Sequence, residues 1–156
     1  MPVTRSRPLV VFACVQNAGR SQIAAALFNA SVDPARARAM SAGTAPGRQV
    51  HPEVVRVMAE LGIDLAAARP QLLTADLAAG ASHLITMGCG EACPFIPGAI
   101  RDDWPLPDPH GRSLDEVRAI RDDIRRRVGA LIETNGWARP RDADRDAGAA
   151  GQSSTT

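Results

Sequence analysis

The chain has 156 residues, 45% of them hydrophobic, which is enough for one core but not for two separate domains. Its net charge of +1 and its 3% aromatic content provide neither the basic surface nor the stacking side chains of a nucleic-acid-binding protein. No segment has the length and apolar character of a membrane span, and the start MPVTRSRP does not resemble a signal peptide, so we expect a cytoplasmic protein with no membrane or nucleic-acid partner.

The first predicted strand is an uninterrupted apolar run at 9–13, a pattern typical of strands buried on both faces of a parallel sheet. This run places Cys14 at the carboxyl end of the strand. A short loop containing Asn17 and Gly19 follows, and residues 22–29 then carry apolar side chains at helical spacing. The sequence therefore predicts a strand, a tight loop and a helix, with a cysteine where the loop begins.

The residue types in this loop suit an oxyanion site built around a thiolate. Backbone N–H groups and the dipole at a helix start attract anions, and they also favour the thiolate form of Cys14. Arg20 can bind two oxygens of a tetrahedral anion, and the Ser21 hydroxyl can donate to the thiolate. Asn17 and Gly19 tolerate the left-handed backbone that we expect here. Free cysteine is often simply buried, but this combination of features favours catalysis.

The segment CVQNAGRSQ resembles the phosphate-loop signature of the low-molecular-weight protein tyrosine phosphatase superfamily, most closely its arsenate reductase branch. The resemblance covers residues 8–135. It implies a single α/β domain with a four-stranded parallel sheet in flavodoxin-like order, helices on both faces and a phosphate-binding loop after the first strand. It also implies that Cys14 is the nucleophile. The oxyanion would be bound by the loop residues Val15, Gln16, Asn17, Ala18, Gly19, Arg20 and Ser21.

Further along the chain, the pattern predicts a weak strand at 37–41, a helix that begins near Pro52, a short helix with Thr74 as its N-cap, and a third strand at 84–87. His51 directly precedes the second helix. We interpret it as a loop or capping residue rather than a general base, because its position explains it without catalysis.

Two more cysteines follow the third strand, in the loop GCGEACP. The spacing of Cys89 and Cys93 allows a disulfide, whereas zinc is a poorer interpretation because no further Cys pair or nearby His pair completes a ligand set. Two incidental cysteines are a third possibility, which the polar, Gly-flanked loop disfavours. The resemblance implies a relay in which Cys89 attacks the Cys14 adduct and Cys93 then resolves the disulfide. The thioredoxin-coupled reductases usually space these two cysteines more widely.

A last strand is predicted at 100–104, and it leads into PLPDP, a stiff loop with three prolines in five residues. The resemblance implies that Asp108 in its Asp-Pro pair is the general acid that protonates the leaving oxygen. Asp before Pro is also ordinary turn chemistry. Asp102, Asp103 and Asp115 are nearby competitors, and only the order of the motifs favours Asp108.

A capping box begins at Ser113 and opens a long helix with an exposed arginine run at 125–127. Its inward residues are predicted to be Val117, Ile120, Ile124, Val128 and Leu131. We expect the domain to occupy residues 1–137 and residues 138–156 to form a disordered tail, because the tail lacks apolar content.

The resemblance implies reduction of arsenate to arsenite for arsenic detoxification, without a cofactor or a metal. The reductant would be thioredoxin, or mycothiol with a glutaredoxin-like protein. The alternatives are a low-molecular-weight protein tyrosine phosphatase, a mycothiol-dependent arsenate-thiol transferase and a non-catalytic oxyanion or thiol sensor. Family phosphatases often carry tyrosines after the Asp-Pro pair, whereas here His110 and Gly111 follow it and the chain has no Tyr. A phosphatase also has no use for Cys89 and Cys93. We therefore expect an arsenate reductase, with which residual phosphatase activity is compatible.

Overall fold

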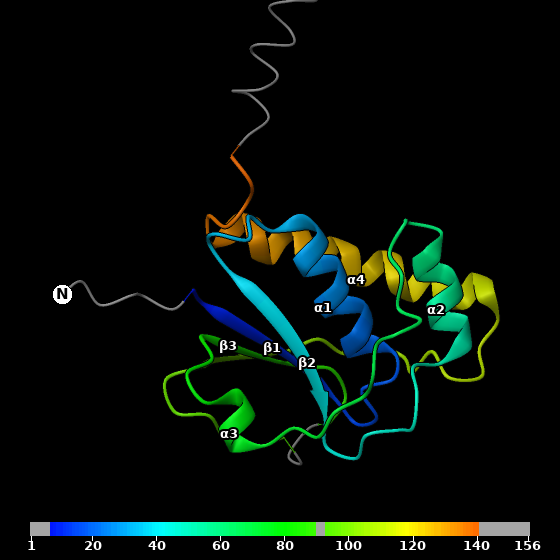
Figure 1. Ribbon diagram of the computed structural model, residues 1–156, viewed down its shortest axis with the longest axis horizontal. Helices are drawn as coiled ribbons and strands as arrows, with labels where there is room; N and C mark the ends of the chain where they lie inside the picture. The colour runs from blue at the N-terminus through cyan, green and yellow to red at the C-terminus, as the bar shows by residue number, and fades with distance from the viewer. Residues whose placement is uncertain (1–6, 90–92, 141–156) are drawn as a thin grey trace, which may run out of the picture.

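A computed structural model describes residues 7–89 and 93–140 of the chain. Its four strands are all parallel and form one sheet in the order β2-β1-β3-β4 (Figure 1). The described elements, in chain order, are β1 (Leu9–Cys14), α1 (Arg20–Ser31), β2 (Arg38–Gly43), α2 (Pro52–Ala59), α3 (Ala75–Ala78), β3 (His83–Thr86), β4 (Ile100–Asp103) and α4 (Leu114–Thr134). The predicted single α/β domain with a flavodoxin-like parallel sheet is confirmed.

Strand β1 lies at the centre of the sheet, and all its residues are buried. Its side chains alternate between two cores, as strand geometry requires. Val10, Phe12 and Cys14 belong to the larger core, beneath α1, α2 and α4. Val11 and Ala13 belong to the smaller core on the face that α3 covers (Figure 1). Cys14 therefore leaves the sheet on the face where α1 begins.

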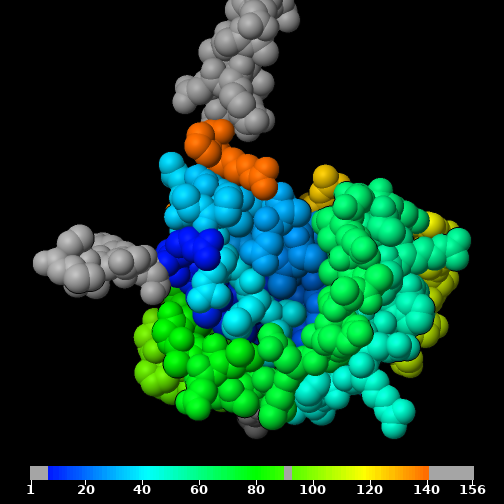
Figure 2. All heavy atoms as spheres, viewed as in Figure 1, coloured from blue at the N-terminus to red at the C-terminus, as the bar shows by residue number. Residues whose placement is uncertain are grey.

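The segment between α2 and α3 passes along the edge of the sheet beside β2 (Figure 2). Its backbone continues the sheet pattern at one point, because Gly43 donates to the carbonyl of Gln71 over 2.9 Å and accepts from Leu73 over 2.8 Å. Gly43 also lies tightly against the loop after β1, where a Cβ atom would come within 2.4 Å of the Val15 carbonyl oxygen. The segment thus holds Gln71 beside that loop.

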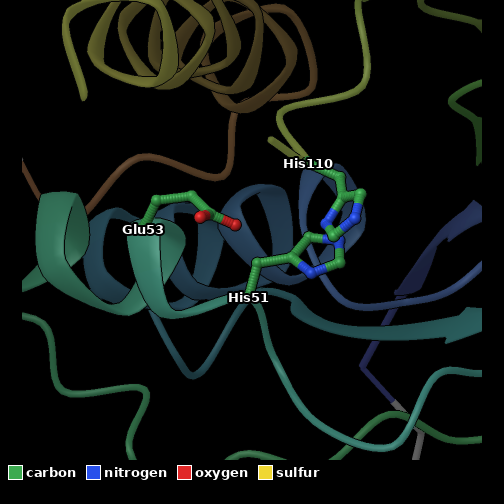
Figure 3. Close-up of side chains that lie close together, drawn as sticks. All are labelled: His51, Glu53 and His110. Carbon is green, nitrogen blue, oxygen red and sulfur yellow. The ribbon is translucent and has the colours of Figure 1, made fainter. Parts of the chain in front are cut away.

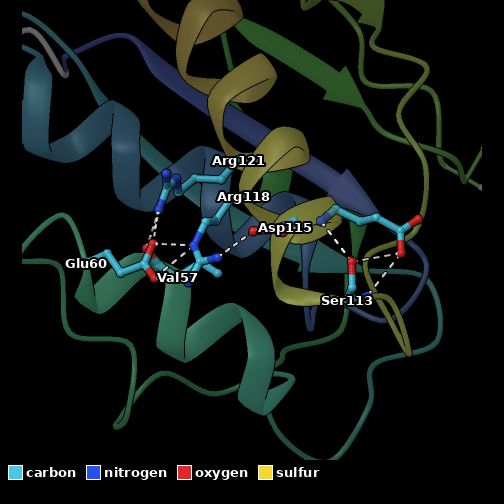
Figure 4. Close-up of polar contacts among 7 residues, drawn as sticks. Val57, Glu60, Ser113, Asp115, Arg118 and Arg121 are labelled. Carbon is cyan, nitrogen blue, oxygen red and sulfur yellow. Dashed lines mark hydrogen bonds and ion pairs between the residues drawn. The ribbon is translucent and has the colours of Figure 1, made fainter.

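An ionic network joins the end of α2 to α4 (Figure 4). Arg118 contacts the Glu60 carboxylate over 2.7 Å and Asp115 over 2.8 Å, while Arg121 contacts Glu60 over 2.8 Å. Arg121 also donates to the carbonyl of Val57, again over 2.8 Å. The hydrogen bonds from Arg118 and Arg121 lower the pKa of Glu60 to about 2. The network fixes α2 against the longest helix of the domain.

Helix α4 begins with the predicted capping box, in which Ser113 accepts from the Glu116 N–H and the Glu116 carboxylate accepts from the Ser113 N–H. Four of the five predicted inward residues are buried. Leu131 is only partly buried, and Ile132 takes its place, because it continues the i, i+4 series of Ile124 and Val128. The prediction for Leu131 was therefore wrong by one position.

The last described contacts of the domain extend past Trp137, which is buried. Ala138 pairs with Val32 in an antiparallel bridge, and Arg139 donates to the Val32 carbonyl over 3.2 Å. The rest of the predicted tail, residues 141–156, lies outside the described residues. In the described part of the chain, no helix combines the length and the apolar character that crossing a membrane requires.

Candidate active site

The loop between β1 and α1 is built around Asn17. In the part of the chain that the structure describes, it is the only non-glycine residue with a positive φ, at 53°. Its buried side chain stabilises this left-handed conformation: Nδ2 donates to Ser21 Oγ over 2.8 Å, and Oδ1 accepts from the backbone of Gln71 over 2.9 Å. The side chain of Gln22 adds a hydrogen bond to the Asn17 carbonyl over 3.0 Å. The left-handed backbone predicted at Asn17 is thus present.

Gly19 serves the loop in a different way from the one predicted. Its φ is −142°, so its backbone is not left-handed. Glycine is needed here for space, since a Cβ atom would come within 2.6 Å of Pro109 Cγ and 3.4 Å of the His51 ring. The prediction was wrong because it considered only the backbone, whereas the constraint comes from a turn that lies far away in the sequence.

The sulfur of Cys14 is surrounded by hydrogen-bond donors. It lies 2.8 Å from Ser21 Oγ and accepts from the Asn17 N–H over 3.2 Å. Because the Asn17 side chain already donates to Ser21 Oγ, the Ser21 hydroxyl proton is free to point at the sulfur. Both contacts can stabilise negative charge that develops on the sulfur during a reaction. Cys14 is the free cysteine of the chain and is only 2% exposed.

Arg20 occupies the first position of α1 and is held from two sides. Its Nη1 donates to the Leu106 carbonyl over 2.9 Å. Its guanidinium lies against Gly88, where a Cβ atom would come within 2.6 Å of Nη1. The pocket beside it has a volume of about 180 Å³ and brings together the predicted residues Cys14, Arg20 and Asp108. It is lined by Cys14, Val15, Gln16, Ala18, Gly19, Arg20, His51 and Asp108.

Asp108 reaches this pocket on a turn with fixed geometry. Its carboxylate accepts from the His110 N–H over 2.9 Å, and its carbonyl accepts from Arg112 Nε over 2.7 Å. Pro109 is buried against Gly19. The side chain remains exposed, so it can exchange a proton with solvent.

The competing aspartates are engaged elsewhere. Asp102 accepts from the Trp104 indole over 3.2 Å, and Asp103 accepts from the Thr86 hydroxyl over 2.8 Å. None of the three, Asp115 included, lines the pocket. Of these four aspartates, Asp108 is the one that lines the described pocket.

Cys89 and Cys93 are joined by a disulfide, with their Cα atoms 5.7 Å apart. Both are buried in the smaller core, while residues 90–92 between them lie outside the described residues. Cys89 Sγ lies 3.8 Å from the carbonyl oxygen of Ala13, the residue that precedes Cys14. The disulfide thus begins next to β1, the strand that ends at Cys14.

His51 is the site residue whose role the sequence did not indicate. It precedes α2 as predicted, but its side chain makes no capping hydrogen bond. Its ring lines the pocket and faces His110, with ring centroids 4.5 Å apart (Figure 3). Burial lowers the pKa of His51, and so does the nearby His110, while Glu53 and Asp108 partly offset these effects.

The comparison with known families agrees with this geometry. The model of the low molecular weight phosphotyrosine protein phosphatase family matches residues 9–136. The chain belongs to this family. A protein of Halobacterium salinarum, provisionally named an arsenate reductase, is 37% identical over 126 residues, which are 78% of this chain and 89% of that protein. The glutaredoxin arsenate reductase of Synechocystis is 32% identical over 126 residues, 79% of this chain and 95% of that protein.

Family members of known structure share the fold. The thioredoxin-dependent arsenate reductase of Corynebacterium glutamicum superposes with a TM-score of 0.73 at 36% identity, over 85% of this chain. The matched region spans 63% of that protein's length. The family therefore includes proteins named for arsenate reduction with two different thiol reductants.

Proposed function

We propose that this protein reduces arsenate to arsenite for arsenic detoxification. Cys14 is the nucleophile, Cys89 attacks the Cys14 adduct, and Cys93 resolves the disulfide that this attack forms. The observation that carries the proposal is the position of the Cys89–Cys93 pair, whose first sulfur lies 3.8 Å from the Ala13 carbonyl at the carboxyl end of β1. A phosphatase needs the anion loop but has no use for a redox pair beside it. Relatives named as arsenate reductases give the proposal independent support.

The first step is attack on arsenate bound in the loop. Backbone N–H groups of residues 15–20 and the guanidinium of Arg20 bind its oxygens, as helix starts and arginine forks do for phosphate. The thiolate of Cys14 then forms a bond to arsenic. Asp108 gives its proton to a hydroxyl group of arsenate, and the As–O bond breaks as this group leaves as water. The product is an arsenic(V) adduct on Cys14.

The second step transfers two electrons. The thiolate of Cys89 attacks the sulfur of Cys14, and the electron pair of the sulfur–arsenic bond stays with arsenic, which leaves as arsenite. A Cys14–Cys89 disulfide remains. The thiolate of Cys93 then attacks Cys89 and releases Cys14 as a thiolate for the next cycle. The resulting Cys89–Cys93 disulfide has the same pairing as the bond present in the structure, and this pairing supports the proposed order of steps.

An external thiol must reduce Cys89–Cys93 before another turnover. We assign this role to thioredoxin, because a dithiol protein is suited to reduce a disulfide such as Cys89–Cys93, whose two cysteines are close in the sequence and do not line the pocket. The name of the Corynebacterium structure supports this assignment, while the Synechocystis protein is named for glutaredoxin. Mycothiol with a glutaredoxin-like protein is the alternative. Because reactive thiols need a reducing compartment, the proposal also places the protein in the cytoplasm.

A phosphotyrosine phosphatase is the second candidate function. The family match supports it, and Cys14, Arg20 and Asp108 would serve both reactions. The described lining of the pocket includes His51 but no Phe or Trp that could stack on a phosphotyrosine ring, and the chain has no Tyr.

The deciding experiment measures arsenite release and p-nitrophenyl phosphate hydrolysis on the same preparation, with a thioredoxin system supplied. We expect arsenite release with many turnovers and only slow phosphate hydrolysis. The variant Cys14→Ser should lose both activities, because serine at neutral pH does not supply an anionic nucleophile. Efficient phosphate hydrolysis without arsenite release would instead identify a phosphatase. Substantial turnover by Cys14→Ser would refute the assignment of the nucleophile.

A further inference from the structure

Three side chains that the proposed chemistry does not use lie close together: His51, which lines the pocket, and Glu53 and His110 (Figure 3). One nitrogen or carboxylate oxygen from each lies within 4.8 Å of the others. His51 and Glu53 come from the start of α2, whereas His110 comes from the turn that carries Asp108. Within the described residues, none of the three side chains is occupied by a hydrogen bond or an ion pair.

The backbone fixes both halves of this cluster. The N–H of His51 donates to the Ala18 carbonyl over 2.9 Å, and Glu53 lies in the first turn of the helix that follows. On the other side, His110 is tied to Asp108 through its backbone N–H. The two imidazole rings are tilted by 38° with centroids 4.5 Å apart. The fold therefore brings the side chains together without any direct bond between them.

We propose that His51, Glu53 and His110 bind a divalent transition-metal ion of the zinc class, with its fourth coordination position directed at the active-site pocket. Two imidazole nitrogens and one carboxylate oxygen are a donor set that zinc takes with one position left open. Neighbouring ligands around tetrahedral zinc lie about 3.3 Å apart, so the side chains must close by roughly 1.5 Å. The rotatable bonds of the half-buried Glu53 permit this movement. The open position would lie beside the pocket, because His51 lines it together with Asp108.

The site has a functional consequence for the reaction beside it. A bound ion would cross-link α2 to the turn of residues 108–110, and it would lie close to the carboxylate of Asp108, which already interacts with His51. Both effects reduce the freedom of Asp108 to deliver a proton. Metal binding should therefore inhibit turnover. No sequence pattern indicated a metal site, because the two histidines belong to segments far apart in the chain.

The test must keep metal away from the thiols. We would use the Cys14→Ser protein with its Cys89–Cys93 disulfide intact, and measure Zn²⁺ binding by calorimetry and Co²⁺ binding by visible absorption. One ion per chain should bind, and Co²⁺ should give the intense bands of a tetrahedral complex. Adding Glu53→Gln or His110→Ala should weaken binding at least tenfold. The matched control Glu133→Gln, an exposed change near the end of α4, should bind as tightly as the parent.

The comparison of Glu53→Gln with Glu133→Gln decides the outcome, because both changes are isosteric and neither removes a core contact. Equal affinity in these two variants would overturn the proposal and show a non-specific surface ion. Absence of stoichiometric binding to the parent would overturn it as well. Loss of binding in Glu53→Gln and His110→Ala, with normal melting temperatures, would establish the site independently of the enzyme's activity.

Discussion

The hydroxyl oxygen of Ser21 lies 2.8 Å from the sulfur of Cys14, and the side chain of Asn17 donates to that same oxygen. The Asn17 amide thus fixes the direction of the hydroxyl, so that its proton faces the sulfur. Removing the hydroxyl leaves Cys14 with one donor fewer and Asn17 with an unsatisfied amide. The two hydrogen bonds that link Asn17, Ser21 and Cys14 therefore stabilise negative charge on the sulfur.

Ser21→Ala should slow the alkylation of Cys14 by iodoacetamide at neutral pH roughly tenfold or more, the usual worth of a hydrogen bond to a charged group. Mass spectrometry of the alkylated protein measures the rate. Ser31→Ala, an exposed change at the end of the same helix, is the control and should alkylate at the wild-type rate. An unchanged rate in Ser21→Ala would mean that the hydroxyl does not act on the thiolate.

Asp108→Asn should slow arsenite formation by about 10²–10⁴-fold, because the variant cannot donate the proton that the leaving oxygen needs. The turn should survive, since an asparagine oxygen still accepts from the His110 N–H. Phosphate affinity should therefore stay close to the wild-type value. Asp103→Asn is the control, because Asp103 bonds Thr86 away from the pocket. If Asp103→Asn rather than Asp108→Asn slows the chemistry, the acid has been assigned wrongly.

Gly88→Ala should weaken oxyanion binding through Arg20. The new methyl group would come within 2.6 Å of Nη1 and displace the guanidinium from its place beside the Leu106 carbonyl. We expect the Kd for phosphate, used as a stable analogue of arsenate, to rise roughly tenfold or more. Gly98→Ala separates this effect from backbone strain, because Gly98 also has a positive φ but a methyl group there would have no neighbouring atom within 4 Å. Equal phosphate affinity in both variants would argue against the contact.

The ion pair network on α2 makes stability depend on pH. The pKa of Glu60 is about 2 in the folded protein, below its ordinary value of 4.5, so its stabilising effect is complete above pH 4.5 and is lost as the pH falls towards 2. Glu60→Gln should lower the melting temperature at pH 7, and its difference from the wild type should shrink between pH 4.5 and 2. Glu133→Gln serves as the exposed control. A difference that is constant over this range would contradict the prediction.

The strand, loop and helix around Cys14 could be predicted because their signals are local. An apolar run, an Asn that accepts a left-handed backbone and a segment with apolar side chains at helical spacing lie within 21 consecutive residues, 9–29. The same holds for the capping box of α4, where Ser113 and Glu116 are neighbours in the chain. The apolar run at 9–13 also indicated a strand buried in a parallel sheet, whereas the four-stranded flavodoxin-like order was implied by the family resemblance.

The contacts that shape the rim of the pocket could not be predicted. Gly19 is constrained by Pro109, and Arg20 by Gly88, through packing between segments that are distant in sequence. The position of His51 against His110 has the same origin. A sequence pattern records the spacing along one segment, whereas these contacts depend on how α2 and the turn after β4 are oriented by the sheet beneath them.

The relay makes the most specific prediction about the two distal cysteines. Because Cys93 resolves the disulfide between Cys14 and Cys89, Cys93→Ser should complete about one turnover and then accumulate that disulfide. Cys89→Ser is the matched control, since it cannot form the bond at all. Mass spectrometry of peptides from acid-trapped protein identifies the pairing directly.

The two variants together separate the relay from its alternative. In the relay, Cys93→Ser releases about one arsenite per chain in a burst, whereas Cys89→Ser releases none with thioredoxin because its Cys14 adduct has no internal partner. Cys89 is buried beside Ala13, the residue that precedes Cys14, which supports the proposal that Cys89 attacks first. If both variants instead sustain multiple turnovers with a low-molecular-weight thiol and a glutaredoxin-like protein, the external thiol, rather than Cys89, attacks the adduct on Cys14. Cys89 and Cys93 would then have no part in the reaction.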